Sequence, residues 1–263
     1  MTLQEFVEFI PALVLIFSRM AGLFILAPVL GGAQVPTIVR VGGALTVSGV
    51  LAPFVEYSPA AIPADIIGYT AAVASETLIG LVLGFGATLL FTALQIAGEV
   101  IDIQMGFMVA NVTDPQTNVA IPLMGQFVYL LAILVFLAVN GHHWLLMAME
   151  ASYDLIPLAG VTHRPGFDVH FTQMASDMFV RAVQFGAPVV AALILTEMAM
   201  GVVGRAVPQM NIMMLGFSIR IAIGFAVLWF VMATLVELLV VVMDRNHLFA
   251  DLFRLVRGLG PPP

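Results

Sequence analysis

The sequence predicts an all-α integral membrane protein. Hydrophobic residues make up 61% of its 263 residues and charged residues only 10%, whereas soluble proteins have about 45–50% apolar and about 25% charged residues. The mean hydropathy is correspondingly high, at +1.08. The apolar residues are gathered in six successive runs, and no stretch between the runs resembles a soluble module. We therefore expect a single domain over residues 1–263 that is built from membrane helices.

The first half of the chain contains three of these apolar runs. Residues 9–30 reach the length of about 20 residues that a membrane-spanning helix needs. Residues 36–55 form a shorter run, and residues 66–98 form a run that is long for one span. This third run carries Gly80 and Gly84, four residues apart, which predicts a face that another helix can approach closely.

The second half begins with an apolar run that we expect to be broken. It covers residues 121–149 and holds the sequence NGHHW, in which Asn140 and Gly141 favour a turn. Residues 154–177 follow and form the most polar stretch of the chain. Such a composition predicts an exposed loop.

Two long helices and a tail are expected in the last third. Residues 179–203 form the first helix, with Pro188 as a candidate kink. Residues 212–243 form the second helix. In the tail, residues 244–263, apolar side chains share one face and arginines fall elsewhere. This pattern predicts an amphipathic helix that lies on the membrane surface or docks on a partner.

A polar segment separates the third and fourth runs. At its start Gln95, Glu99 and Asp102 fall at spacings of four and three, so they share one helix face. The helical pattern then fades, and the proline after Asp114 disfavours helix at the residue before it. We therefore predict an irregular loop of about a dozen residues between Phe107 and Pro122, which is either a functional element or a solvated connector.

Charged residues interrupt the apolar runs. A central charge in a membrane helix costs about 2.5–3.5 kcal/mol on insertion scales, so each needs a partner, water or an interface. Such charges form either a path for protons or substrate, or ion pairs between the helices of an assembly. The second interpretation is favoured because the charges show no recurring spacing. The charges concerned are Arg19, Glu76, Glu197, Arg220 and Glu237.

Composition and motifs exclude several functional classes. The net charge is −7 and every basic residue is an arginine, without a basic patch, which argues against binding of nucleic acid. No cysteine is present, so disulfides and cysteine-ligated metals are excluded. His142 and His143 lack the HExxH spacing, Ser218 lacks the glycine of a nucleophile elbow, and no P-loop occurs. We therefore predict no enzymatic activity, no metal and no cofactor.

Several sequence features occur together along the chain. The segment GEVIDIQMGFMVANVTDP covers residues 98–115, and NGHHW covers residues 140–144. The accompanying residues are Pro36, Arg40, Ser152, Tyr153 and Pro157. With these features essentially the whole chain resembles the FliR/SctT family of type III secretion export-gate subunits. The GExIDxQxGF pattern favours a flagellar over a virulence system.

This resemblance implies a non-enzymatic subunit of an export gate in the bacterial inner membrane. It implies a FliP-like part joined to a FliQ-like hairpin, which assembles with FliP and FliQ homologues in a helical closed ring and contacts an FlhB homologue. Unfolded export substrates would pass through this ring. The family also implies a multi-pass protein of the flagellar basal body, in contact with lipid, of which much lies above the plane of the membrane.

The resemblance also places a pore plug on residues 106–122. A weakly held loop is displaced at modest free-energy cost, while its apolar side chains exclude water and ions from a closed pore. The expected plug residues are Gly106, Phe107, Met108, Val109, Val112, Asp114, Pro115 and Pro122. The expected polar residues at interfaces or in the pore lining are Glu76, Glu99, Asp102, Gln104, Glu197 and Arg220.

Two alternatives remain open on the residues alone. A secondary transporter for ions or small molecules would use Glu76, Glu197 and Arg220 for ion coupling, and the broken helices at residues 98–122 for binding. A membrane scaffold without any conduit would need none of these residues for transport.

Overall fold

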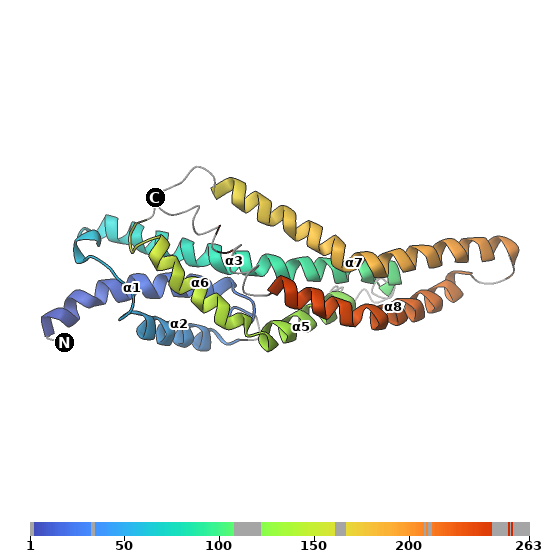
Figure 1. Cartoon of the computed structure of the whole chain (residues 1–263), viewed down its shortest axis with the longest axis horizontal. Coiled ribbons are helices and arrows are strands. Elements are labelled where there is room, and N and C mark those ends of the chain that lie inside the picture. Colours follow the sequence, from blue (N-terminus) through green and yellow to red (C-terminus); the bar gives the residue numbers. More distant parts are fainter. Residues whose placement is uncertain are drawn as a thin grey trace, which may run out of the picture. The chain divides into compact units, whose positions relative to one another are not determined.

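In the computed structural model, all regular secondary structure of the described residues is helical (Figure 1). Those residues are 3–32, 35–107, 122–160, 167–207, 209, 212–243, 252 and 254. The helices are α1 (Leu3–Leu26), α2 (Thr37–Leu51), the short 3₁₀ helix η1 (Pro59–Ala61), α3 (Ile66–Met105), α5 (Leu123–Ala138), α6 (Gly141–Leu155), α7 (Phe167–Ala206) and α8 (Ile212–Met243). The predicted all-α fold class is confirmed.

Four helices in the described part of the chain are long and apolar enough to cross a membrane. α5 and α6 are bent by 69° at their break and provide a fifth span if they are taken together. These lengths confirm the prediction of an integral membrane protein. The four single spans are Phe9–Leu26, Ile66–Met105, His170–Ala206 and Met214–Thr234.

Most predicted helices are present, with changes at their ends. α8 has the bounds predicted for residues 212–243. The break expected near Asn140 is present between α5 and α6, and Asn140 itself is left-handed with a φ of 57°. By contrast, α2 has only 15 residues, which is short of the roughly 20 that a spanning helix needs. The first helix ends at Leu26, four residues before the predicted end of the run at residues 9–30.

The prediction of a loop over residues 154–177 is wrong for most of the residues in this range that the structure describes. α6 enters this range, and α7 begins inside it at Phe167. Phe171, Met174 and Met178 are spaced three and four residues apart, so they extend the apolar stripe of α7 toward its N-terminus. The polar residues lower the average hydropathy of the stretch, but they fall between the stripe positions and leave the helical period intact.

The contacts of the chain divide into two compact units. Unit 1 comprises Met1–Leu89, Leu137–Ala175 and Met243–Pro263, and unit 2 comprises Leu90–Phe136 and Ser176–Val242. α3 and α7 each contribute residues to both units. This division does not test the expectation of a single domain, which stays a prediction.

Unit 1 is built around the packing of α1 on the first part of α3 (Figure 1). Gly80 lies against the backbone carbonyl of Arg19, so a Cβ atom at this position would collide with α1. A Cβ atom on Gly84 would lie 3.1 Å from the carbonyl oxygen of Leu23, so the helices are close here too, although less tightly packed than at Gly80. The close helix approach predicted at these two glycines is therefore confirmed. The buried side chains around the contact are Leu15, Ile16, Met20, Leu23, Ile79 and Leu83.

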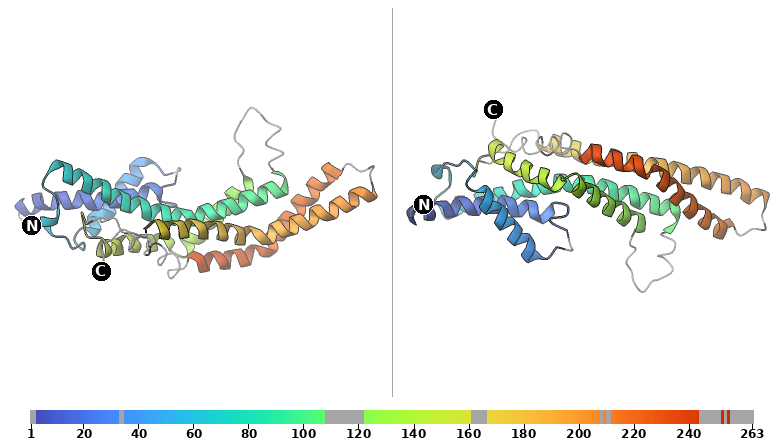
Figure 2. Two further views of the ribbon diagram at one scale, coloured as in Figure 1. Left: turned by 90° about the horizontal axis from the view of Figure 1, so that it is seen from above. Right: turned by 60° about the horizontal axis from the view of Figure 1, so that its bottom comes forward.

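Unit 2 joins the second part of α3 to α5, α7 and α8 (Figure 2). The ring of Phe91 packs edge-to-face against Phe136, at a centroid distance of 5.3 Å, and against Tyr129, at 6.1 Å. These aromatic contacts attach α5 to α3. α7 carries Pro188 inside its helix, as the sequence indicates. Of the predicted tail, residues 244–263, only Leu252, which is buried, and Arg254, which is exposed, lie in the described residues.

Candidate functional site

The structure describes both ends of the predicted plug, residues 106–122. Gly106 and Phe107 follow α3, and Pro122 precedes α5. The other predicted plug residues lie outside the described residues. They are Met108, Val109, Val112, Asp114 and Pro115.

Gly106 ends α3 in a conformation that suits glycine. Its φ is 86°, in a region that side chains with a Cβ atom adopt only under strain. Its amide donates to the carbonyls of Asp102, at 3.0 Å, and Ile103, at 3.1 Å, which satisfies the end of the helix. The chain therefore leaves α3 in a direction set by this residue.

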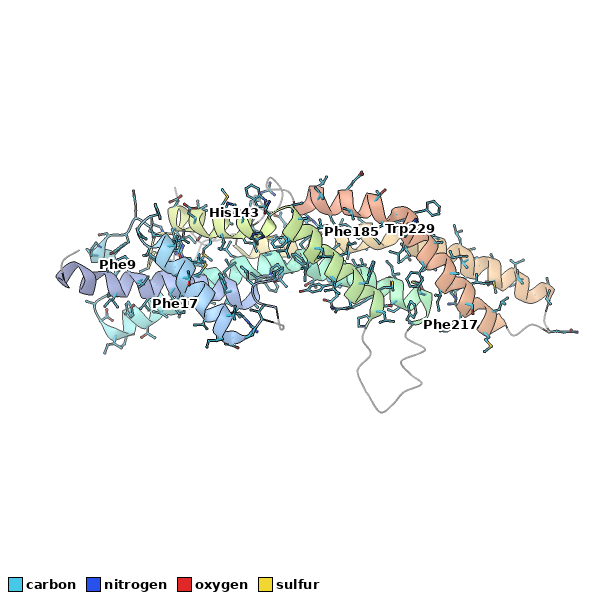
Figure 3. The ribbon with its side chains drawn as sticks, turned by 90° about the horizontal axis from the view of Figure 1, so that it is seen from below. Phe9, Phe17, His143, Phe185, Phe217 and Trp229 are labelled. Atoms are coloured by element: carbon cyan, nitrogen blue, oxygen red, sulfur yellow. The ribbon has the colours of Figure 1, made fainter. Side chains whose placement is uncertain are left out.

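Aromatic side chains hold this end of α3 against α8. A Cβ atom on Gly106 would lie 3.0 Å from the ring of Phe217, which is labelled in Figure 3. The ring of Phe107 packs edge-to-face on Phe225, with centroids 6.4 Å apart. Neither Phe217 nor Phe225 was singled out from the sequence, because an aromatic residue in an apolar run carries no signal of its partner.

The other end of the segment is held by Asp102 of α3. Its Oδ2 atom accepts hydrogen bonds from the amides of Met124, at 3.0 Å, and Gly125, at 3.3 Å. These are amides of the first turn of α5, which have no partner within their own helix. The carboxylate also stands at the positive end of the α5 dipole. Asp102 is 1% exposed, so the cap is shielded from water.

The backbones of α3 and α5 touch one turn before Asp102. A Cβ atom on Gly98 would lie 2.6 Å from the Cα atom of Gly125 and 2.7 Å from the carbonyl oxygen of Met124. No side chain fits in this space without moving one of the helices. The absence of a side chain at Gly98 therefore brings Asp102 within reach of α5.

The remaining polar residues near the segment are less buried. The side-chain amide of Gln95 donates to Glu99 at 3.0 Å, which confirms that these two residues share a helix face. Glu99 and Gln104 are both partly exposed. Their roles at an interface or in a pore lining stay predictions, as does that of Asp102, for which the structure shows a partner inside the chain.

Glu76 lies in unit 1 and forms a buried ion pair with Arg19. The Nε atom of Arg19 is 2.5 Å from Oε2 of Glu76, and both side chains are 0% exposed. The guanidinium also donates to the hydroxyl of Ser152, at 3.0 Å, and to the carbonyl of Ile156, at 2.9 Å. The amide of Ala159 donates to the second oxygen of Glu76 at 2.9 Å. This network ties α1 and α3 to the end of α6.

Glu197 and Arg220 form a second, weaker pair in unit 2. Their closest charged atoms are 3.9 Å apart, and their side chains are 60% and 29% exposed respectively. The pair joins α7 to α8 at a place where most neighbouring side chains are apolar. Glu197 and Arg220 therefore pair with each other, whereas Glu76 pairs with Arg19 in unit 1.

The chain matches known proteins over most of its length. The family model of the bacterial export proteins, family 1, matches residues 10–245. The chain is similar to the flagellar biosynthetic protein FliR of Bacillus subtilis (strain 168), with 37% identity over 86% of the chain and 88% of that protein. It is also similar to FliR of Escherichia coli (strain K12), with 28% identity over 92% of the chain and 89% of that protein. The chain therefore belongs to the bacterial export proteins, family 1, among which its relatives are flagellar FliR proteins.

Proposed function

We propose that the chain is a non-enzymatic subunit of the flagellar type III protein export gate. In this proposal it assembles with FliP and FliQ homologues, contacts an FlhB homologue, and forms part of the closed pore for unfolded export substrates. The assembly lies in the bacterial inner membrane, in the flagellar basal body. The similarity to FliR proteins over most of the chain supports this function.

Within this gate, residues 106–122 act as the plug. The observation that carries this proposal is the anchoring of both ends of the segment. Gly106 and Phe107 pack against α8, and Asp102 caps the first turn of α5. A loop whose ends are held on packed helices returns to one place after it is displaced. Such a loop can seal a pore repeatedly without refolding the helices that bear it.

The surface of unit 2 supports an assembled state. Trp229 and Phe230 of α8 are 82% and 83% exposed, and Trp229 points away from the neighbouring helices (Figure 3). Glu197, which is 60% exposed, stands among exposed apolar side chains of α7, and its charge is costly against lipid. A protein partner can cover the apolar side chains and also provide a polar group for Glu197.

The transporter alternative finds less support in the structure. A coupling carboxylate must exchange its partner for an ion during each cycle. Both oxygens of Glu76 accept hydrogen bonds from groups of the chain itself, and the side chain is fully buried. We therefore assign Glu76 to the structural network around Arg19 and favour the gate.

The plug is tested by replacing residues 107–121 with a short Gly-Ser linker, which retains Gly106 and Pro122. We expect membrane vesicles that contain the assembled gate to leak small ions, because the apolar side chains that exclude water are removed. The measurement is ion flux into vesicles with equal amounts of assembled wild-type and variant complex. Unchanged permeability at equal assembly would contradict the proposed plug.

A further inference from the structure

A pocket opens in unit 1 where α1 and α3 begin. Its volume is about 530 Å³, within the roughly 300–1,000 Å³ of small-molecule sites. The lining is mostly apolar and comes from Ile10 and Pro11 of α1, from the segment 59–65, and from Ile66, Tyr69 and Thr70 of α3. The pocket therefore has the size and the surface of a site for the apolar part of a ligand.

The pocket lies where two candidate membrane spans start. The span of α1 begins at Phe9, and that of α3 begins at Ile66. Both helices run in the same direction from this end (Figure 1), and the hydroxyl of Tyr69 joins them by donating to the carbonyl of Pro11 at 3.0 Å. The 18 residues of the α1 span rise about 27 Å, close to the thickness of the hydrocarbon core. The pocket is therefore at the depth of the lipid headgroups.

The polar side chains of the pocket have only acceptors left to offer. The hydroxyls of Tyr69 and Thr70 donate their protons to backbone carbonyls, at 3.0 Å and 2.7 Å. Asp65 caps α3, because its Oδ2 atom accepts from the amide of Gly68 at 2.8 Å. The cap uses one carboxylate oxygen, and Oδ1 accepts no hydrogen bond from the residues that the structure describes. A ligand that uses these groups must donate hydrogen bonds.

The charge of the pocket favours a cation over an anion. Asp65 is the charged residue among the described lining residues, and this set contains no arginine that could pair with a phosphate. A primary ammonium carries a positive charge and three N–H donors, so it suits Oδ1 of Asp65 and the hydroxyl oxygens beside it. A choline headgroup has the charge but no donor. A glycerol headgroup leaves the negative charge of its phosphate uncompensated.

We propose that this pocket binds a phospholipid whose headgroup carries a primary ammonium, as in phosphatidylethanolamine. The ammonium pairs with Asp65, and the first part of one acyl chain fills the apolar space. Ile66 and Ile67 are 86% and 84% exposed, and they extend the apolar surface beside the pocket for the rest of that chain. This lipid site goes beyond the export function and does not depend on it.

The headgroup preference is tested by native mass spectrometry of the full-length chain in mild detergent. The added lipids are phosphatidylethanolamine, phosphatidylcholine and phosphatidylglycerol. We expect phosphatidylethanolamine to bind about tenfold more tightly than the other two, the factor that corresponds to one hydrogen bond with a charged group. Equal binding of the three lipids would overturn the proposal.

Asp65→Asn tests the carboxylate. The variant loses the charge but retains a side-chain oxygen that can cap α3. It should bind phosphatidylethanolamine about tenfold more weakly, at the level of phosphatidylcholine. Asp154→Asn, at an exposed position of α6, is the matched control and should bind as the wild type does. An unchanged preference for phosphatidylethanolamine in Asp65→Asn would contradict the assigned role of the carboxylate and overturn the proposal.

Ala64→Trp tests the pocket itself. Ala64 is exposed and lines the pocket, so an indole at this position occupies the space that the lipid needs. Ala74→Trp, at an exposed position of α3 outside the lining, is the control. A photoreactive phosphatidylethanolamine should label peptides within residues 59–70 of the wild type and of Ala74→Trp, but not of Ala64→Trp. Equal labelling of the two variants, or labelling only elsewhere in the chain, would show that the lipid does not occupy this pocket.

Discussion

Arg19 and Glu76 show how single residues hold unit 1 together. Both side chains are fully buried, and the guanidinium lies 4.2 Å from the centre of the Tyr153 ring in addition to its hydrogen bonds. A buried ion pair is no proof of stability, because desolvation opposes the attraction of the charges. Removal of one partner, however, leaves the other charge buried without compensation. The effect of a single substitution should therefore be large.

We predict that Glu76→Ala lowers the stability of the chain by about 3–5 kcal/mol, the range for breaking a buried ion pair. The matched control is Glu197→Ala, which breaks the exposed pair with Arg220 and should cost at most about 1 kcal/mol. Both variants can be compared by denaturation of the detergent-solubilised chain with SDS. Similar losses for the two variants would show that the buried network is not the main support of unit 1.

The sequence indicates that Arg19 and Glu76 each need a partner, but it does not show that they pair with each other. The charge of Arg19 in an apolar run signals a need for a partner, yet Glu76 lies 57 positions away along the chain. The spacing of three residues predicts that Asp102 shares a helix face with Glu99. Its bond to the amides of α5 could not be foreseen, because backbone amides carry no sequence signal and the close approach at Gly98 depends on the packed helices.

At the scale of the helices, hydrophobic patterns predict the presence of a helix better than they predict the residues at which it begins and ends. The bounds of α8 follow from a long apolar run that stops at polar residues. The start of α7 was missed because its apolar stripe is narrow and the polar residues beside it dominate the average. The end of α2 at Leu51 does carry a sequence signal, because Pro53 disfavours helix at Ala52 although the run stays apolar to Val55. Periodicity is the better guide where composition is mixed.

The exposed face of α8 gives a prediction for an element. The chain has two tryptophans, so Trp144→Phe leaves Trp229 as the only one. Trp229 is 82% exposed in the chain alone. We predict that brominated detergent quenches its fluorescence in the isolated chain, and that brominated lipid no longer does so in the assembled complex, because a protein partner covers α8.

The control for this measurement is Trp229→Phe, which retains only Trp144. The indole of Trp144 donates to the carbonyl of Val139 at 3.3 Å, inside unit 1. Its quenching should change little on assembly. Quenching of Trp229 by brominated lipid in the assembled complex that is as strong as its quenching by brominated detergent in the isolated chain would mean that α8 faces the bilayer, and it would remove one support of the proposed interface.

At the scale of the whole molecule, the composition of the chain and its similarity to known proteins support different conclusions. Composition and run lengths establish a helical membrane protein with charges that need partners. They do not distinguish a gate from a transporter, because both bury charges and interrupt helices. The similarity to FliR proteins over 86% of the chain provides the family. The structure adds the anchoring of both ends of residues 106–122.

The central claim is that residues 106–122 lie in the path of exported chains. The sequence contains no cysteine, so one introduced cysteine can carry a photo-crosslinker at a single position. The variants are Phe107→Cys and Val112→Cys in the segment, with Val183→Cys as the control at a position of α7 that is 69% exposed. Each is combined with an export substrate that is stalled by a folded domain.

The decisive measurement is the yield of crosslinks between the chain and the stalled substrate. We predict crosslinks from Phe107→Cys and Val112→Cys, and none from Val183→Cys. The amount of stalled substrate that copurifies with each complex normalises the yields. Complexes that hold the substrate but crosslink only from Val183→Cys, or from none of the three positions, would contradict a plug at residues 106–122.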